Sequence, residues 1–117
     1  MLTDSVQTSI PATTTTNVFL GRPIEFIGVA SVARLLAVAD AIGVNFQWLI
    51  NVGGVQLAPI AAGTTANVSS VAGAGPKDDE DTVASGVAIP AGARSQLNVT
   101  NTTAAAINFR YRAIILP

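Results

Sequence analysis

The run Lys77-Asp78-Asp79-Glu80-Asp81 holds five of the 13 charged residues of the sequence, four of them acidic. Carboxylate oxygens are ligands that Ca²⁺ prefers, but a helix-loop-helix calcium loop needs them at alternate positions, with a central glycine. Consecutive side chains on an extended segment point in opposite directions, so one ion could be shared by only a pair of Asp78, Asp79, Glu80 and Asp81. We therefore favour a solvated loop that raises solubility over a calcium site.

The residue types that carry most enzymatic chemistry are missing. The sequence has no histidine and no cysteine, which removes the commonest general base, the commonest zinc ligand and all thiol chemistry. Glycoside hydrolysis would need two carboxylates across a cleft, and nothing in the sequence places Glu25 or Asp40 opposite the acidic run. No glycine-rich phosphate loop is present. The sequence predicts a protein that is not an enzyme and uses no cofactor.

Arg110 and Arg112 lie two residues apart in the predicted strand 107–116 and so share one of its faces. They could bind a phosphate or carboxylate of a partner, but pairing with Glu25 or Asp40 across the sheet is the favoured interpretation. The net charge is −1, without a basic cluster, which argues against a nucleic-acid partner. No run is apolar for long enough to form a membrane helix, and the first residues lack the pattern of a signal peptide.

Most of the chain alternates apolar and polar residues, which predicts strands. The clearest segments are VNFQWLIN (44–51), whose Trp48 lies on the apolar face, and INFRYRAIIL (107–116). Segment 31–39 also fits a helix, but its neighbours favour a strand. Gly53-Gly54 and Pro90-Ala91-Gly92 predict turns. Further strands are expected at 16–20, 23–28, 66–71, 82–89 and 94–101.

About eight to nine short strands, cut by turns at spacings of about ten residues, predict an all-β fold: an antiparallel, jelly-roll-like β-sandwich. Residues 15–117 are expected to form this single domain. The Thr-rich stretch 11–16 looks like a linker, so residues 1–14 are predicted to be an N-terminal arm. Leu2, Val6 and Ile10 of this arm would dock on a neighbouring subunit, and a frayed terminus fits the pattern equally well.

Charged residues make up 11% of the chain and hydrophobic residues 50%, with a mean hydropathy of +0.51. An average domain carries about 25% charged residues. Such a surface is either coated by Thr, Ser, Asn and Gln or covered by other subunits, and we expect both. Ile114 and Leu116 fall on the polar side of the last strand, where they would be exposed in a monomer. The predicted subunit interface comprises Leu2, Val6, Ile10, Arg110, Arg112, Ile114 and Leu116.

The stretches GRPIEFIG (21–28) and VAIPAGARSQLNVTNTTAAAINFRYRAIILP (87–117) resemble small β-sandwich and jelly-roll structural proteins of bacterial viruses. This family comprises capsid decoration or cement proteins and minor capsid subunits. The resemblance implies a homo-oligomer made in the host cytoplasm and located in the virion. It would stabilise the shell through contacts with the major capsid protein or other virion proteins.

The alternative is a carbohydrate- or receptor-binding module of a virion fibre or adhesin. It would need an exposed aromatic patch, for which Trp48 is the one strong candidate.

Overall fold

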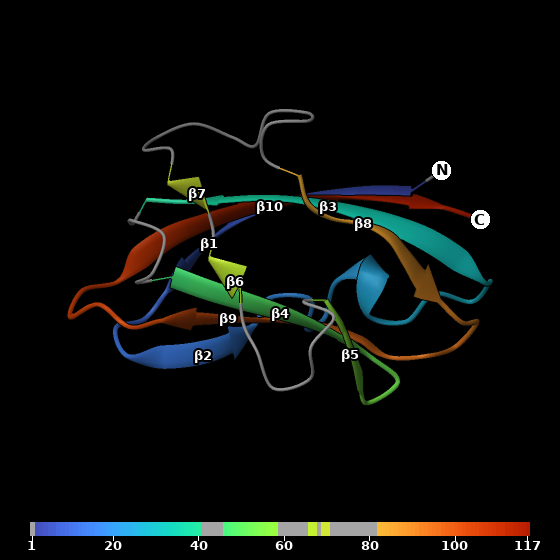
Figure 1. The fold of residues 1–117 in the computed structure, drawn as a ribbon, viewed down its shortest axis with the longest axis horizontal. Helices are drawn as coiled ribbons and strands as arrows, with labels where there is room; N and C mark the ends of the chain where they lie inside the picture. Colours follow the sequence, from blue (N-terminus) through green and yellow to red (C-terminus); the bar gives the residue numbers. More distant parts are fainter. Residues whose placement is uncertain (1, 41–45, 59–65, 68, 71–81) are drawn as a thin grey trace.

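The computed structural model describes residues 2–40, 46–58, 66–67, 69–70 and 82–117 (Figure 1). This part of the chain consists of strands and one 3₁₀ turn, η1 (Pro23–Glu25). The strands are β1 (Leu2–Ile10), β2 (Thr14–Asn17), β3 (Ser31–Ala39), β4 (Phe46–Val52), β5 (Val55–Ala58), β6 (Ala66–Asn67), β7 (Ser69–Ser70), β8 (Thr82–Ile89), β9 (Ser95–Asn101) and β10 (Ile107–Leu116). The segments 31–39, 82–89 and 107–116 are strands with the predicted boundaries.

The strands form two sheets that lie as two layers in Figure 1. Sheet A has the order β1-β10-β3, with both β7 and β8 paired to β3. Sheet B has the order β2-β9-β4, with both β5 and β6 paired to β4. Every pair is antiparallel except β3 with β7. The predicted all-β antiparallel sandwich is confirmed.

The pairing of the eight strands longer than two residues is that of a jelly roll. The first strand pairs with the last (β1 with β10), the second with the last but one (β2 with β9), and β3 pairs with β8. The innermost pair is the hairpin β4–β5. This is the pattern of one long hairpin rolled into two facing sheets.

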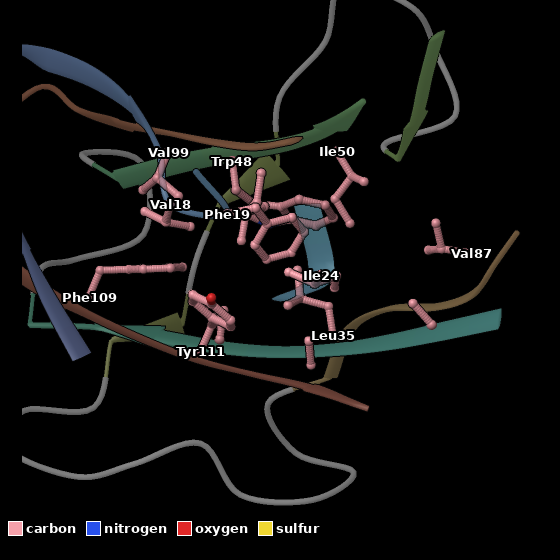
Figure 2. Close-up of a cluster of buried hydrophobic side chains, with 14 of the residues drawn as sticks. Val18, Phe19, Ile24, Leu35, Trp48, Ile50, Val87, Val99, Phe109 and Tyr111 are labelled. Carbon is pink, nitrogen blue, oxygen red and sulfur yellow. The ribbon is translucent and has the colours of Figure 1, made fainter. Parts of the chain in front are cut away.

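The core lies between the sheets and follows from the alternation in the sequence. In β4 and β9, every second residue is buried, and the residues between are half-buried. Figure 2 shows Trp48 and Ile50 of sheet B pointing toward Leu35 and Tyr111 of sheet A. Trp48 is only 3% exposed, which confirms its predicted use in core packing. The rings of Phe46 and Phe109 stack across the core with their centroids 5.7 Å apart.

The two predicted glycine turns are present. Gly53 and Gly54 have φ angles of 59° and 84° and close the β4–β5 hairpin. Positive φ at both central residues gives the turn a twist that matches the strands, and glycine adopts it without steric cost. Between β8 and β9, the Ala93 amide donates to the Pro90 carbonyl at 3.1 Å, with Gly92 at φ 76°.

The predicted strands 16–20 and 23–28 are largely wrong. Strand β2 ends at Asn17, whose Oδ1 accepts the amide hydrogen of Phe19 at 3.1 Å, a side-chain turn that competes with strand pairing. Pro23 then opens η1, where its missing N–H and fixed φ are favourable. In this region only Phe26 makes a β-bridge, to Arg94.

The predicted N-terminal arm is also wrong. Residues 2–10 form β1, which pairs with β10 at nine successive positions, from Leu2 opposite Ile115 to Ile10 opposite Ile107. Ile10 is fully buried, and Val6 packs against the core. Because these apolar residues recur on one face of the strand, their burial holds β1 in the sandwich. Ile10 therefore cannot be a contact for a neighbouring subunit.

Candidate interaction surface

The segment 18–30, which connects β2 to β3, is fastened to the sandwich at several points. The buried carboxylate of Glu25 accepts hydrogen bonds from the Gly21 amide at 3.1 Å and from Arg94 Nε at 3.0 Å. The Gly92 amide donates to the Ile27 carbonyl at 2.7 Å. Together with the Phe26–Arg94 bridge, these bonds fix the segment to the turn between β8 and β9.

A second polar cluster joins the same segment to β1 and β10. Asp4 is turned toward the interior, where its Oδ2 accepts hydrogen bonds from Tyr111 Oη at 2.9 Å and from Arg22 Nε at 3.3 Å. The Arg22 guanidinium also forms an ion pair with Asp4 Oδ1. Burial alone would raise the pKa of Asp4, but the hydrogen bonds from Arg22 and Tyr111 and the charge of Arg22 outweigh it and lower that pKa. Burial, and then the bond to Asp4, raises the pKa of Tyr111 well above its ordinary value.

Large apolar side chains are nevertheless exposed around this fixed segment. In the part of the chain that the structure describes, six large hydrophobic residues are between 47% and 65% exposed. They are Leu20, Phe26, Val29, Val32, Val55 and Leu116, and we call them the apolar end.

Five of the six residues belong to segments that meet at one end of the sandwich, and the sixth, Leu20, precedes Gly21, whose amide donates to Glu25 of the same segment. Val32 of β3 lies opposite Leu116 of β10. Val29 and Phe26 precede β3 in the segment fastened to the β8–β9 turn. The Gly53 amide donates to the Arg94 carbonyl at 2.9 Å and so brings the β4–β5 hairpin to the same turn. In Figure 1, the C-terminus, η1 and the β4–β5 turn all lie in the right half of the molecule.

The outer face of sheet A carries the predicted C-terminal interface residues. Arg110, Arg112 and Ile114 of β10 are half-buried and alternate with inward residues of the same strand, and Leu116 is exposed. Arg110 donates to Asp40 Oδ1 at 2.9 Å and to Gln7 Oε1 at 3.0 Å. Pairing of Arg110 with Asp40 is thus confirmed, whereas Glu25 pairs with Arg94 instead.

The structure therefore divides the predicted interface between two faces of sheet A. Arg110, Arg112, Ile114 and Leu116 share its outer face. Val6 and Ile10 face the core, and Leu2 lies opposite Ile115, a buried residue of β10. Five of the six residues of the apolar end were missed. For Leu20, Val29 and Val55 the signal in the sequence was an apolar residue directly beside a glycine, and Val32 is an outward residue of the alternating segment 31–39.

The described strands of sheet B carry no charge on their outer face. Strands β2, β9 and β4 contain no Asp, Glu, Lys or Arg. Thr15 of β2 hydrogen-bonds Thr100 of β9 at 2.9 Å, and Gln47 of β4 lies opposite Thr100 on the other side. The next outward position pairs Leu49 with Asn98, and the one after it pairs Asn51 with Gln96. The expected coat of hydroxyl and amide groups is present on this face.

The candidate calcium residues Asp78, Asp79, Glu80 and Asp81 lie outside the described residues. Among the residues that are described, no three His, Cys, Asp or Glu side chains gather as metal ligands. None of the described helical structure is long and apolar enough to cross a membrane. The burial of Trp48 removes the aromatic side chain on which a glycan-binding patch would depend.

The chain matches no protein-family model, and comparisons with curated proteins and with solved structures find no significant match.

Proposed function

We propose that this chain is a structural protein of a virus particle, either a capsid decoration or cement protein or a small jelly-roll capsid subunit. In this proposal it stabilises the shell by burying the apolar end against the major capsid protein or another virion protein. The single observation that carries the proposal is the set of six exposed, large hydrophobic residues on segments that are joined at one end of the described jelly roll.

Two properties of the surface support an assembly role. Scattered apolar residues are normal on a monomer, but a group of them marks an interaction site. Moreover, the described residues contain eight charged side chains, and six of these form three ion pairs within the chain. On the described surface, contact with an apolar partner would therefore remove water from few charges, and the desolvation cost would be small.

Burial of the apolar end would contribute on the order of 6 kcal/mol to attachment, before the entropic cost of association is subtracted. Full burial of a large aliphatic or aromatic side chain contributes about 1.5–3 kcal/mol, so a half-exposed one contributes on the order of 1 kcal/mol. Six such residues, together with the backbone segments that hold them in place, supply the apolar centre of a standard interface. The ion pairs of Glu25 and Asp4 keep this end ordered before binding, which lowers the entropic cost.

The fold is compatible with this function but does not establish it. Jelly rolls occur in viral capsid proteins and in lectins, and function resides in sites rather than in folds. A carbohydrate- or receptor-binding module of a virion fibre or adhesin is the second candidate. The amide and hydroxyl groups on the outer face of sheet B favour it, and the burial of Trp48 weighs against it.

The composition of virus particles tests the proposal. We expect peptides of this chain in purified particles of the virus that encodes it, in a fixed ratio to the major capsid protein. Immunolabelling should then place it over the whole shell. Absence from intact particles would refute the proposal, and labelling confined to fibres, with retention on a glycan array, would establish the second candidate.

A further inference from the structure

The free edge of β1 is a second surface, distinct from the apolar end. Within the described residues, β1 pairs with β10 alone. Its other edge extends over about 30 Å at the usual rise per strand residue. The carbonyl of Ile10, the last residue of β1, accepts a hydrogen bond from Asn101 Nδ2 at 3.0 Å. An edge of this kind presents backbone donors and acceptors to any strand that approaches it.

The other edges of the described sheets are short or irregular, as in proteins that prevent edge-to-edge pairing. Strands β2 and β5 have four residues each, and β7 has two. Strand β8 is longer, but its pairing with β3 contains two register shifts, and its Gly86 has a φ of 67°.

Strand β1 is neither short nor irregular. It pairs over nine residues without a register shift and contains no proline and no lysine. Its single charged residue, Asp4, is turned inward and neutralised by Arg22. The exposed side chains on its outer face are small or neutral, namely Thr3, Ser5, Gln7 and Ser9.

We propose that β1 pairs antiparallel with β1 of a second copy of this chain, so that sheet A continues across a twofold axis. A twofold contact requires a surface that is complementary to itself. A regular antiparallel strand meets this requirement through its backbone, and the neutral outer side chains let two copies approach without like-charge repulsion. The contact uses neither the apolar end nor a viral partner. Its test is therefore independent of the test of the proposed function.

Charge placed on this edge tests the proposal. In the double variant Ser5→Glu/Ser9→Glu, each β1 edge would carry two added carboxylates, which would repel those of the second copy. The fold should persist because position 5 lies opposite Arg112. The matched control, Ser85→Glu/Ala104→Glu, adds the same charge at exposed positions outside β1. By light scattering, we expect the wild type and the control to have twice the chain mass of 11.9 kDa, and the β1 variant to have the mass of one chain.

A wild type that has the mass of one chain up to its solubility limit would overturn the proposal, as would a folded β1 variant that remains a dimer. If the double variant does not fold, cross-linking tests whether β1 pairs with β1 of a second copy. The chain has no cysteine, so Ser5→Cys and Ser85→Cys each introduce a unique thiol. On mild oxidation, we expect the Ser5→Cys variant to form covalent dimers faster than the Ser85→Cys variant. Equal rates of dimer formation in the two variants would refute the pairing.

Discussion

At the scale of single residues, Asp4 shows how this chain uses the few charges it has. A carboxylate buried without partners would destabilise the fold strongly. Here Arg22 and Tyr111 both donate to it, so that the first strand, the last strand and the segment before η1 meet at one carboxyl group. The cluster holds in place one part of the segment that displays the apolar end.

Replacement of Tyr111 by Phe should weaken this cluster. The variant removes the 2.9 Å hydrogen bond to Asp4 and leaves the packed ring in place, so we expect a loss of about 1–3 kcal/mol in the free energy of unfolding. Chemical denaturation measures it. A change close to zero would mean that Arg22 alone satisfies Asp4.

Acid should destabilise the protein partly through Asp4. Since the pKa of Asp4 is lower in the folded state than its ordinary value of 3.8, the ionised carboxylate contributes full stability above that pH. The contribution is lost as the pH falls through the folded-state pKa. We expect the difference in stability between the wild type and Asp4→Asn, measured by denaturation from neutral pH down to about pH 3, to shrink with acid. A constant difference would contradict this assignment.

At the scale of elements, strands that alternate and turns that need glycine are the parts that the sequence predicts well. Segment 107–116 has the predicted boundaries because alternation runs through it, and segment 82–89 ends where predicted because the turn at Pro90 follows it. Segments 16–20 and 23–28 were not predictable in this way, because the hydrogen-bonded Asn17 side chain acts against extended pairing in the first and Pro23 in the second. Strand β1 was missed because the Thr-rich stretch after it resembles a linker, and only tertiary pairing with β10 shows otherwise.

The β4–β5 turn should be sensitive to loss of its glycine. Gly54 has a φ of 84° and no neighbouring atom within 4 Å of an added Cβ, so the cost of Gly54→Ala comes from the backbone alone. We expect a loss of about 1–2 kcal/mol. Gly28→Ala is the control, since it has equal space and no positive φ, and it should be neutral or stabilising by up to about 1 kcal/mol. Equal effects of the two variants would contradict the turn geometry.

At the scale of the whole molecule, the two ends of the jelly roll differ in character. One end gathers the exposed apolar residues, whereas Asp40 and Arg110 form an ion pair toward the other end of β10. Sequence reasoning located Leu116 of the apolar end from the strand pattern. It could not locate Phe26 or Val55, because which turns meet at one end depends on the order of the strands in the two sheets.

The central claim is that the chain attaches to a viral shell through the apolar end, and co-sedimentation with shells that lack the chain tests it most directly. The test variant is Phe26→Gln/Leu116→Gln, and the control is Ala104→Gln/Ala106→Gln, at exposed positions in the β9–β10 connection. We predict that the wild type and the control sediment with shells, and that the test variant, equally well folded, binds at least about tenfold more weakly because about 2 kcal/mol of apolar burial is lost. Equal sedimentation of all three proteins, or none by the wild type, would contradict the account.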